Sequence, residues 1–207
     1  MSGKAIVVTS GKGGVGKTTS TANIGTGLAL LGNKVVVIDT DIGLRNLDVI
    51  MGLENRIVYD LVQVIEGTCQ LKQAMVRDRK VDGLHLIPAA QTRDKTAVSP
   101  EQMAALCQQI KDEIEPDYIV IDSPAGIEQG FKNALAGADE AIVITTPEVS
   151  AIQDADRIIS LIEANSGLRP SLIINRLRAD MVEEGNMMGI EDILDLLAVD
   201  LLGIVPE

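Results

Sequence analysis

Short continuous runs of apolar residues alternate along this chain with longer segments that have a helical pattern of apolar positions. An apolar run of strand length is typical of a strand that is buried on both faces, as in a parallel sheet. The predicted strands are Ala5–Ser10, Lys34–Asp39, Leu84–Pro88, Tyr118–Asp122, Ala141–Thr146, Ser171–Asn175 and Leu202–Val205.

The segments between these runs are predicted to be helical. They are Thr18–Leu31, Leu61–Ile65, Leu71–Met75, Pro100–Ile114, Gly130–Leu135, Ala151–Asn165 and Ile190–Leu197. One helix start is marked especially clearly, with Ser99 as N-cap, Pro100 in the first helical position and Gln102 in the first turn.

Neither a repeat nor a linker interrupts this alternation, and a chain of 207 residues suits one domain. We therefore expect a single domain over residues 1–207, of the α/β class. Its sheet should be doubly wound and mostly parallel, with helices on both faces. In such folds the ligand binds outside the carboxyl ends of the strands.

Composition narrows the choice of ligand. Hydrophobic residues make up 46% of the chain but aromatic residues only 1%, so adenine or single-stranded nucleic acid finds little surface for stacking. The formal net charge of −12 repels phosphate backbones, because non-specific DNA binding depends on basic patches. We expect no nucleic-acid partner, although a local basic patch would escape this whole-chain argument.

The cysteine and histidine positions indicate structural roles. Cys69 and Cys107 lack the spacing of a zinc or thioredoxin-type site, and we expect both to be reduced, apolar fillers on helical segments. His85 is interpreted as a hydrogen-bonded strand histidine. Neither a signal peptide nor an apolar run of bilayer length is visible, so we expect a cytoplasmic protein.

A glycine-rich segment between the first predicted strand and the first predicted helix fits the phosphate-loop pattern G-x-x-x-x-G-K-[ST]. Glycines let backbone N–H groups approach a phosphate chain, and the helix N-terminus adds its positive dipole end. Lys17 is expected to neutralise the terminal phosphates, and the Thr18 hydroxyl to ligate Mg²⁺. The predicted nucleotide-binding residues here are Gly11, Lys12, Gly13, Gly14, Val15, Gly16, Lys17, Thr18 and Thr19.

Acidic residues follow two of the predicted strands. Asp122 ends an apolar strand, where an acid can bind the Mg²⁺ of a bound nucleotide directly or through water. Asp39 and Asp41 end the second strand. Asp41 can orient an attacking water, hold a metal-bound water or cap the next turn, and we favour the first role.

A second lysine inside the glycine segment is unusual, because one lysine suffices to hold phosphate within a subunit. The pattern K-G-G-V-G-K-T-T resembles the deviant Walker A loop of the MinD/ParA family of P-loop ATPases. Similarity extends from Gly3 to Glu207 and is strongest to the MinD branch, which positions the division septum. The segments that carry it are Val8–Thr19, Asp41–Asp48, Pro88–Lys95, Asp122–Gly126 and Pro147–Ser150.

The resemblance implies an ATP hydrolase that uses Mg²⁺ and forms a homodimer when ATP is bound. Lys12 would supply positive charge across the dimer to the partner's phosphates; its alternative role is a solvated loop lysine. Catalysis would rest on Lys12, Lys17 and Asp41, the last in a switch loop near the γ-phosphate. Asp122 would end the Walker B strand, the amide of Asn175 would read the purine, and Arg176 would follow it.

The resemblance also implies protein partners, namely a division inhibitor and an activator of the ATPase. Asp154 and Asp156 match the helix that binds them, although the two acids would equally suit the first turn of any surface helix. Arg93 and Asp94 are weaker candidates for the dimer or partner face. A ParA-like ATPase that positions DNA or cargo is the alternative function, and an iron–sulfur carrier would need clustered cysteines.

The end of the chain departs from the family pattern. MinD proteins continue with a basic amphipathic helix that anchors them to the inner face of the membrane, whereas this chain stops at Glu207. The segment Ile190–Leu197 carries acids on its polar face, so it should pack on the sheet and avoid anionic lipid. We expect a C-terminally truncated sequence, with membrane contact only through a helix that the sequence lacks.

Overall fold

Buried apolar strands form an eight-stranded sheet in the computed structural model, which describes residues 3–94 and 97–207. The spatial order is β3-β4-β2-β5-β1-β6-β7-β8, and only β3 runs antiparallel to its neighbour. The strands are β1 (Lys4–Thr9), β2 (Val35–Asp39), β3 (Val76–Arg77), β4 (Leu84–Ile87), β5 (Tyr118–Asp122), β6 (Glu140–Thr145), β7 (Ser171–Leu177) and β8 (Asp200–Pro206).

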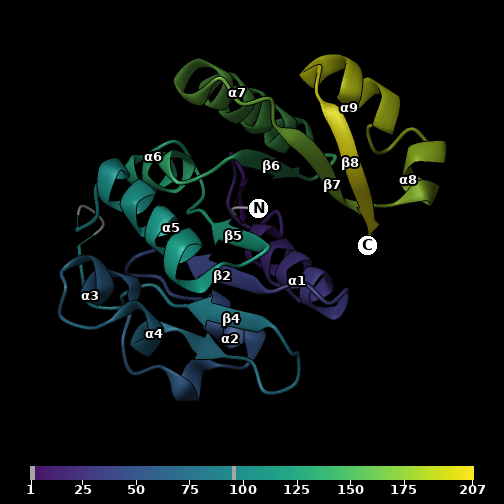
Figure 1. The fold of residues 1–207 in the computed structure, drawn as a ribbon. Helices are drawn as coiled ribbons and strands as arrows, with labels where there is room; N and C mark the ends of the chain where they lie inside the picture. Colours follow the sequence, from purple (N-terminus) through teal and green to yellow (C-terminus); the bar gives the residue numbers. More distant parts are fainter. Residues whose placement is uncertain (1–2, 95–96) are drawn as a thin grey trace.

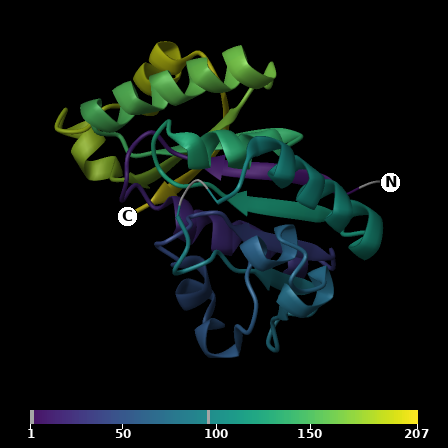
Figure 2. The same cartoon turned by 90° about the vertical axis from the view of Figure 1, so that its left-hand side faces the viewer.

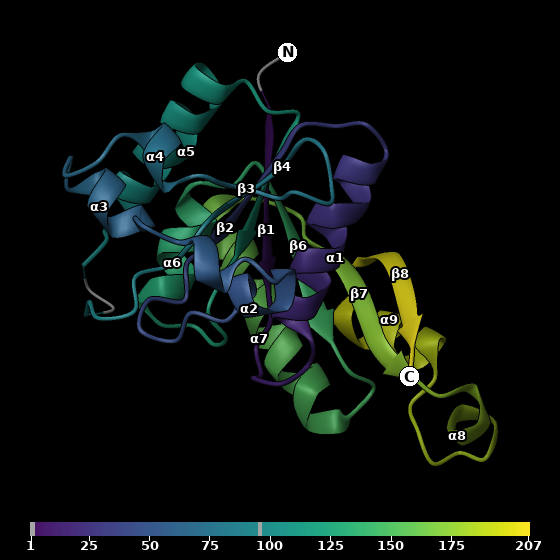
Figure 3. The same ribbon diagram turned by 90° about the horizontal axis from the view of Figure 1, so that it is seen from below.

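Helices cover both faces of this sheet, and each face has its own cluster of buried side chains. The smaller cluster lies under α1 and α2, whereas α3, α4, α5, α6, α7 and α9 contribute to the larger one. In Figure 3, α1 lies on one side of the central strands and α5 and α6 on the other. The helices are α1 (Lys17–Leu30), α2 (Leu47–Met51), α3 (Leu61–Ile65), α4 (Leu71–Ala74), α5 (Pro100–Ile114), α6 (Gln129–Ala136), α7 (Val149–Ser166), α8 (Ala179–Glu183) and α9 (Ile190–Leu197).

The central strands bring the loops of interest together. Because β1 lies between β5 and β6, and β2 pairs with β5 on the other side, the loops after β1, β2 and β5 leave the same edge of the sheet (Figure 1). Figure 2 shows the arrows of β1 and β5 pointing to that edge. This parallel, doubly wound arrangement confirms the predicted fold class.

The predicted helix start at Ser99 is also confirmed. The Ser99 hydroxyl oxygen accepts a hydrogen bond from the backbone N–H of Gln102, and the Gln102 side chain accepts one from the backbone N–H of Ser99. This reciprocal pair satisfies two N–H groups that have no partner inside the helix.

Several expectations about elements were wrong. The short elements β3, α2 and α8 and the 3-10 turn Glu54–Arg56 were not predicted. Cys69 lies between α3 and α4 and not on a helix. Both cysteines are free thiols, and burial raises the pKa of Cys107 to about 12. His85 lies on β4 and its side chain has a hydrogen bond with the backbone of Gly83, as the interpretation of a hydrogen-bonded strand histidine requires, although its Nδ1 has no partner among the described residues.

Among the described helices, none combines the length and the apolar composition that crossing a bilayer requires.

Candidate functional site

The glycine-rich loop between β1 and α1 is open on one side and closely packed on the other. An added Cβ on Gly13 or Gly14 would meet no atom within 4 Å. Gly14 and Gly16 have φ angles of 81° and 94°, in the left-handed region that favours glycine. The open side therefore allows an anion to approach the backbone N–H groups of the loop and the N-terminus of α1.

Lys17, the first residue of α1, forms a buried ion pair with the last residue of β5. The distance from Lys17 Nζ to Asp122 Oδ1 is 2.9 Å, and the two side chains are 8% and 2% exposed. Lys17 Nζ also donates to the Thr18 hydroxyl at 3.2 Å. Thr21, one turn further along α1, donates its hydroxyl to the same Asp122 oxygen at 2.9 Å. The structure thus brings together the three residues predicted to bind phosphate and metal.

An open cavity of about 380 Å³ lies beside this cluster. It is bordered by the phosphate loop, by the loops after β2 and β5, and by the end of β7. The lining residues are Ser10, Gly13, Gly14, Gly16, Lys17, Thr18, Thr19, Asp41, Asn46, Ala125 and Arg176. Eight of these were predicted from the sequence as catalytic or nucleotide-binding residues, whereas Ser10, Asn46 and Ala125 were not.

The side chain of Lys12 turns away from this cavity toward α7. Its Nζ donates to Glu148 Oε2 at 3.1 Å and to Ser150 Oγ at 3.0 Å, and the side chain is 39% exposed. Lys12 does not line the cavity of its own subunit. Its ammonium group is therefore held at the surface of the subunit, on the first turn of a neighbouring helix.

The loop after β2 wraps around the carboxylate of Asp39. This carboxylate accepts hydrogen bonds from the backbone N–H groups of Asp41, Asn46 and Leu47 at 2.9, 3.3 and 3.2 Å. The pKa of Asp39 is raised to about 7, mainly by burial and to a lesser degree by the charge of Asp122 on the adjacent strand, although the hydrogen bonds from the backbone N–H groups oppose this rise. Asp39 is thus a buried acid that organises the loop carrying Asp41.

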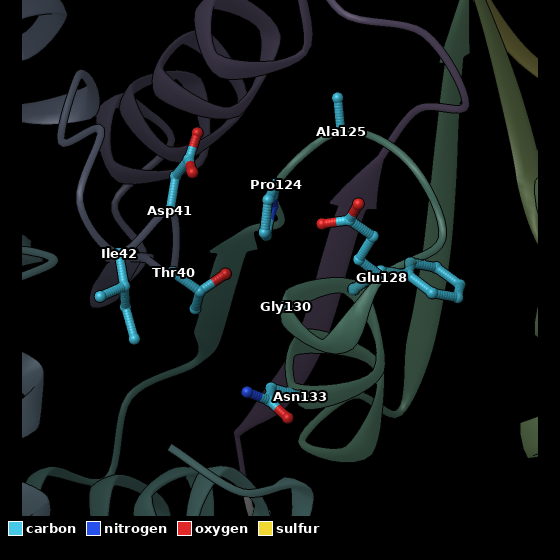
Figure 4. A pocket seen from close by; sticks show the side chains of 9 residues that line it. Thr40, Asp41, Ile42, Pro124, Ala125, Glu128, Gly130 and Asn133 are labelled. Carbon is cyan, nitrogen blue, oxygen red and sulfur yellow. The ribbon is translucent and has the colours of Figure 1, made fainter. Parts of the chain in front are cut away.

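Asp41 also borders a small hollow of about 30 Å³ between the loops after β2 and β5. In Figure 4, Thr40, Asp41 and Ile42 face Pro124 and Ala125 across this hollow. Because Asp41 and Ala125 line the larger cavity as well, both loops extend from the hollow to the phosphate loop.

Asn175 and Arg176 lie near the end of β7, which continues to Leu177, beyond the predicted strand end. Asn175 Nδ2 donates to the backbone carbonyl oxygen of Val15 at 2.8 Å, and its Oδ1 accepts from the backbone N–H of Arg176 at 3.0 Å. Arg176 has a φ of 58° and lines the cavity, whereas Asn175 does not. The amide of Asn175 therefore contacts the phosphate loop itself.

The helix with the predicted partner-binding acids packs directly on the phosphate loop. A Cβ on Gly11 would lie 2.2 Å from the backbone oxygen of Asp154, so α7 approaches this position too closely for a side chain. Asp154 is partly buried and lies 3.7 Å from Arg157, whereas Asp156 is exposed. The first turn of α7 contains no acid, because the helix begins at Val149, so the explanation of both acids by a first turn was wrong.

The weaker candidates Arg93 and Asp94 lie outside the cavity. Arg93 Nη2 forms an ion pair with Glu66 Oε2 at 2.8 Å. Lys95, the last residue of one segment that carries the resemblance, lies outside the described residues.

The oxygen donors present here suit a small, hard cation such as Mg²⁺. Thr18 offers a hydroxyl and Asp122 a carboxylate, and Mg²⁺ usually combines one or two such ligands with water and nucleotide phosphates. The described residues contain no cluster of three histidine, cysteine or acidic side chains suited to a metal ion. A protein-only cage is therefore not found in this part of the chain, and the donors fit a metal that arrives with a nucleotide.

Three residues that shape the site were not predicted to have the roles that the structure gives them. Thr21 orients Asp122, Asp39 organises the loop after β2, and the Ser10 hydroxyl donates to the Lys12 carbonyl oxygen at 3.0 Å. Thr21 had a usable signal, because it lies four residues after Lys17 and so on the same face of the helix, and Asp39 had one as an acid at the end of a predicted strand.

Comparison with known proteins identifies relatives over nearly the whole chain. A family profile described as an AAA domain matches residues 3–174. The chain is 59% identical over 207 residues to the septum site-determining protein MinD of Bacillus subtilis (strain 168), a match that covers 99% of this chain and 76% of the relative.

Solved structures agree with this result. The MinC:MinD cell division protein complex of Aquifex aeolicus contains a chain with a TM-score of 0.91 and 50% identity, covering 99% of this chain and 81% of that one. The septum site-determining protein MinD of Pyrococcus horikoshii OT3, complexed with Mg-ADP, has a TM-score of 0.86 and 29% identity, with coverage of 99% and 81%.

Proposed function

Since the chain belongs to the MinD branch of the MinD/ParA family of P-loop ATPases, we propose that it is a switch whose dimer closes on ATP and reopens on hydrolysis. The chain is an ATPase with a role in placing the division site. The proposal adds the states of the switch, the residues that control them and the partners that read them.

The observation that carries this proposal is the convergence of the open glycine loop, Lys17, Thr18 and Asp122 at one cavity. A triphosphate needs inward-facing N–H groups, a lysine and hydroxyl and carboxylate oxygens for its cation. In the proposed complex the Lys17 ammonium leaves Asp122 and binds the terminal phosphates instead. Thr18 and Asp122 would hold Mg²⁺, and the bound ion would supply positive charge against the phosphate oxygens.

Hydrolysis in this proposal depends on Asp41. Its carboxylate orients the water whose oxygen attacks the terminal phosphorus as the bond to the bridging oxygen breaks. Asp41 suits this role because it lines the cavity from a loop that Asp39 organises. The reaction is slow in the isolated protein and faster when a partner completes the site.

Dimer closure in this proposal depends on Lys12. The ammonium group already points out of its own cavity, and we propose that in the dimer it leaves Glu148 and Ser150 for the phosphates bound by the other subunit. It then supplies charge in trans, as an arginine finger does.

The proposed partners are a division inhibitor and an activator of the ATPase. A related MinD chain has been solved in a complex with MinC, which supports an inhibitor of that kind as partner. We propose that Asp154 and Asp156 on α7 contribute to this contact.

Three substitutions test the switch against a control. Lys17→Ala should abolish binding of MgATP in titration calorimetry. Lys12→Ala should preserve binding but lose both the ATP-dependent dimer in light scattering and phosphate release. Asp41→Ala should form a dimer that does not turn over. The exposed Lys72 provides the control Lys72→Ala, which should behave as the unaltered protein does.

The results separate the parts of the proposal. An unaltered protein that shows no heat with MgATP contradicts nucleotide binding altogether. A normal ATP-dependent dimer in Lys12→Ala removes the role of Lys12 in trans and leaves nucleotide binding intact.

A further inference from the structure

We propose that Asn175 is a positioning residue of the phosphate loop, whose amide aims the backbone N–H of Gly16 at the bound phosphates. This inference rests on the proposed function, because it concerns the same nucleotide site. The family resemblance implies that Asn175 contacts the purine. The inference adds an effect of Asn175 on phosphate binding, which should be present even when the ligand has no base.

The first step is the contact between β7 and the loop. Asn175 Nδ2 donates to the Val15 carbonyl oxygen at 2.8 Å, across 160 positions of sequence. The amide nitrogen also packs on the next residue of the loop, because a Cβ on Gly16 would lie 2.2 Å from it. The Val15 carbonyl oxygen and the Gly16 Cα both belong to the peptide unit that joins Val15 to Gly16.

The second step is the geometry of that peptide unit. In a trans peptide, the carbonyl oxygen of one residue and the N–H of the next point in opposite directions. The structure contains no cis peptide among the described residues. A hydrogen bond that holds the Val15 carbonyl toward Asn175 therefore holds the Gly16 N–H away from Asn175. Gly16 lines the cavity, so this N–H is directed to the phosphate side of the loop.

The third step is the orientation of the amide itself. Its Oδ1 accepts the backbone N–H of Arg176 at 3.0 Å, which distinguishes the oxygen side of the amide from the nitrogen side. Arg176 has a φ of 58°, a conformation that few residues other than glycine adopt. The hydrogen bond from the Arg176 N–H thus holds the Asn175 oxygen on one side of the amide and leaves the nitrogen facing the loop.

The fourth step is the number of hydrogen bonds that an amide can form. An asparagine side chain has two N–H donors and two acceptor lone pairs. One of each is used by Arg176 and Val15, so one of each is left for the edge of a purine. Support of the phosphate loop and contact with a base are therefore compatible in the same side chain.

The test uses a ligand that has phosphates but no base, namely magnesium tripolyphosphate, beside MgADP. Asn175→Ser is too short to reach Val15, and Asn175→Leu keeps the volume of the side chain without its hydrogen bonds. Loss of one hydrogen bond that organises an anion site should lower the affinity for tripolyphosphate about tenfold in both variants. The affinity for MgADP should fall by at least the same factor, because its phosphates bind the same loop.

Asn165→Ser is the matched control. Asn165 is an exposed asparagine near the end of α7, and its Nδ2 donates to the Leu161 carbonyl oxygen at 2.7 Å. The control thus loses the same kind of hydrogen bond at a site remote from the cavity. It should bind both ligands as the unaltered protein does, and thermal unfolding of all variants verifies that they are folded.

The possible results have distinct meanings. If the Asn175 variants bind tripolyphosphate with normal affinity and lose affinity only for MgADP, the amide contacts the base alone and the inference is overturned. If the unaltered protein binds MgADP but not tripolyphosphate, the loop does not grip phosphates by itself and the inference is also overturned. An unaltered protein that binds neither ligand overturns the proposed function as well.

Discussion

The Lys17 ammonium and the Asp122 carboxylate neutralise each other in a region that solvent hardly reaches. Taking either charge out of water is costly, and the attraction between them offsets that cost only while both are present. In the nucleotide-free protein, Lys17 therefore has a structural role in addition to its proposed role at the phosphates.

Lys17→Met should lower the free energy of unfolding by about 3 kcal/mol, because it leaves Asp122 buried without its cation. The double variant Lys17→Met/Asp122→Asn should recover part of this loss, since no uncompensated charge remains. Urea unfolding of the nucleotide-free proteins measures both values. Asp122→Asn alone completes the comparison, and if the effects of the two single substitutions simply add, the two groups do not interact in the way that their distance indicates.

Asp39 should make stability depend on pH. Its pKa is about 7 in the folded protein and near 3.8 when unperturbed. An acid with a raised folded-state pKa contributes stability that is fully present below the unfolded pKa and is lost as the pH rises through the folded one. The nucleotide-free protein should therefore lose up to about 4 kcal/mol between about pH 4 and about pH 7 through this group.

Asp39→Asn should remove that part of the pH dependence, whereas the exposed Asp156→Asn should retain it. Urea unfolding across this pH range makes the comparison, and identical profiles for all three proteins would assign the slope to other groups.

Among the helices, α5 begins with the most complete capping arrangement predicted from sequence. Ser99→Ala should cost about 1 kcal/mol of stability, because the N–H of Gln102 loses its acceptor. Ser99→Gly should cost only a few tenths, since glycine is tolerated as N-cap. Thermal or urea unfolding ranks the variants by stability. Equal stability of Ser99→Ala and the unaltered protein would show that the cap contributes little.

Elements were predictable where local sequence decides them. The glycine loop, the helix after it and the buried strands carry their patterns within a few neighbouring residues. In contrast, α2 begins where the N–H of Leu47 donates to the carboxylate of Asp39, a partner eight residues away on β2. The two-residue strand β3 exists through pairing with β4, and no propensity of two residues signals that.

The residues of the candidate site also differ in whether local sequence or distant contacts determine their positions. The residues of the phosphate loop were predictable because they are contiguous, and most of them line the cavity. The pairing of Lys17 with Asp122 and the contact of Asn175 with Val15 join residues 105 and 160 positions apart. Such contacts depend on the strand order, which one sequence does not specify.

Over the whole molecule, the charge of −12 opposes association of two copies. Raising the ionic strength from about 0.01 M to about 0.1 M shortens the Debye length from about 30 Å to about 10 Å. The proposed ATP-dependent dimer should therefore become tighter with added salt, because surface repulsion is screened while the proposed buried contact between Lys12 and phosphate is affected less.

Analytical ultracentrifugation with ATP at several salt concentrations measures this trend. Its control is the MgATP affinity of Lys12→Ala, a variant expected to stay monomeric, because this affinity reports the salt dependence of nucleotide binding alone. A dimer that dissociates as salt rises would mean that attraction between exposed charges governs closure.

The contact between α7 and the phosphate loop has a consequence for genetics. At Gly11 the helix meets the loop through the main-chain oxygen of Asp154, so no change of an α7 side chain removes this contact. Alanine scanning of the helix would pass over it, because alanine keeps the main chain, and would report only on contacts that α7 makes through its side chains. The contact is tested instead by substitution of Gly11, because any larger residue at this position forces the phosphate loop and α7 apart.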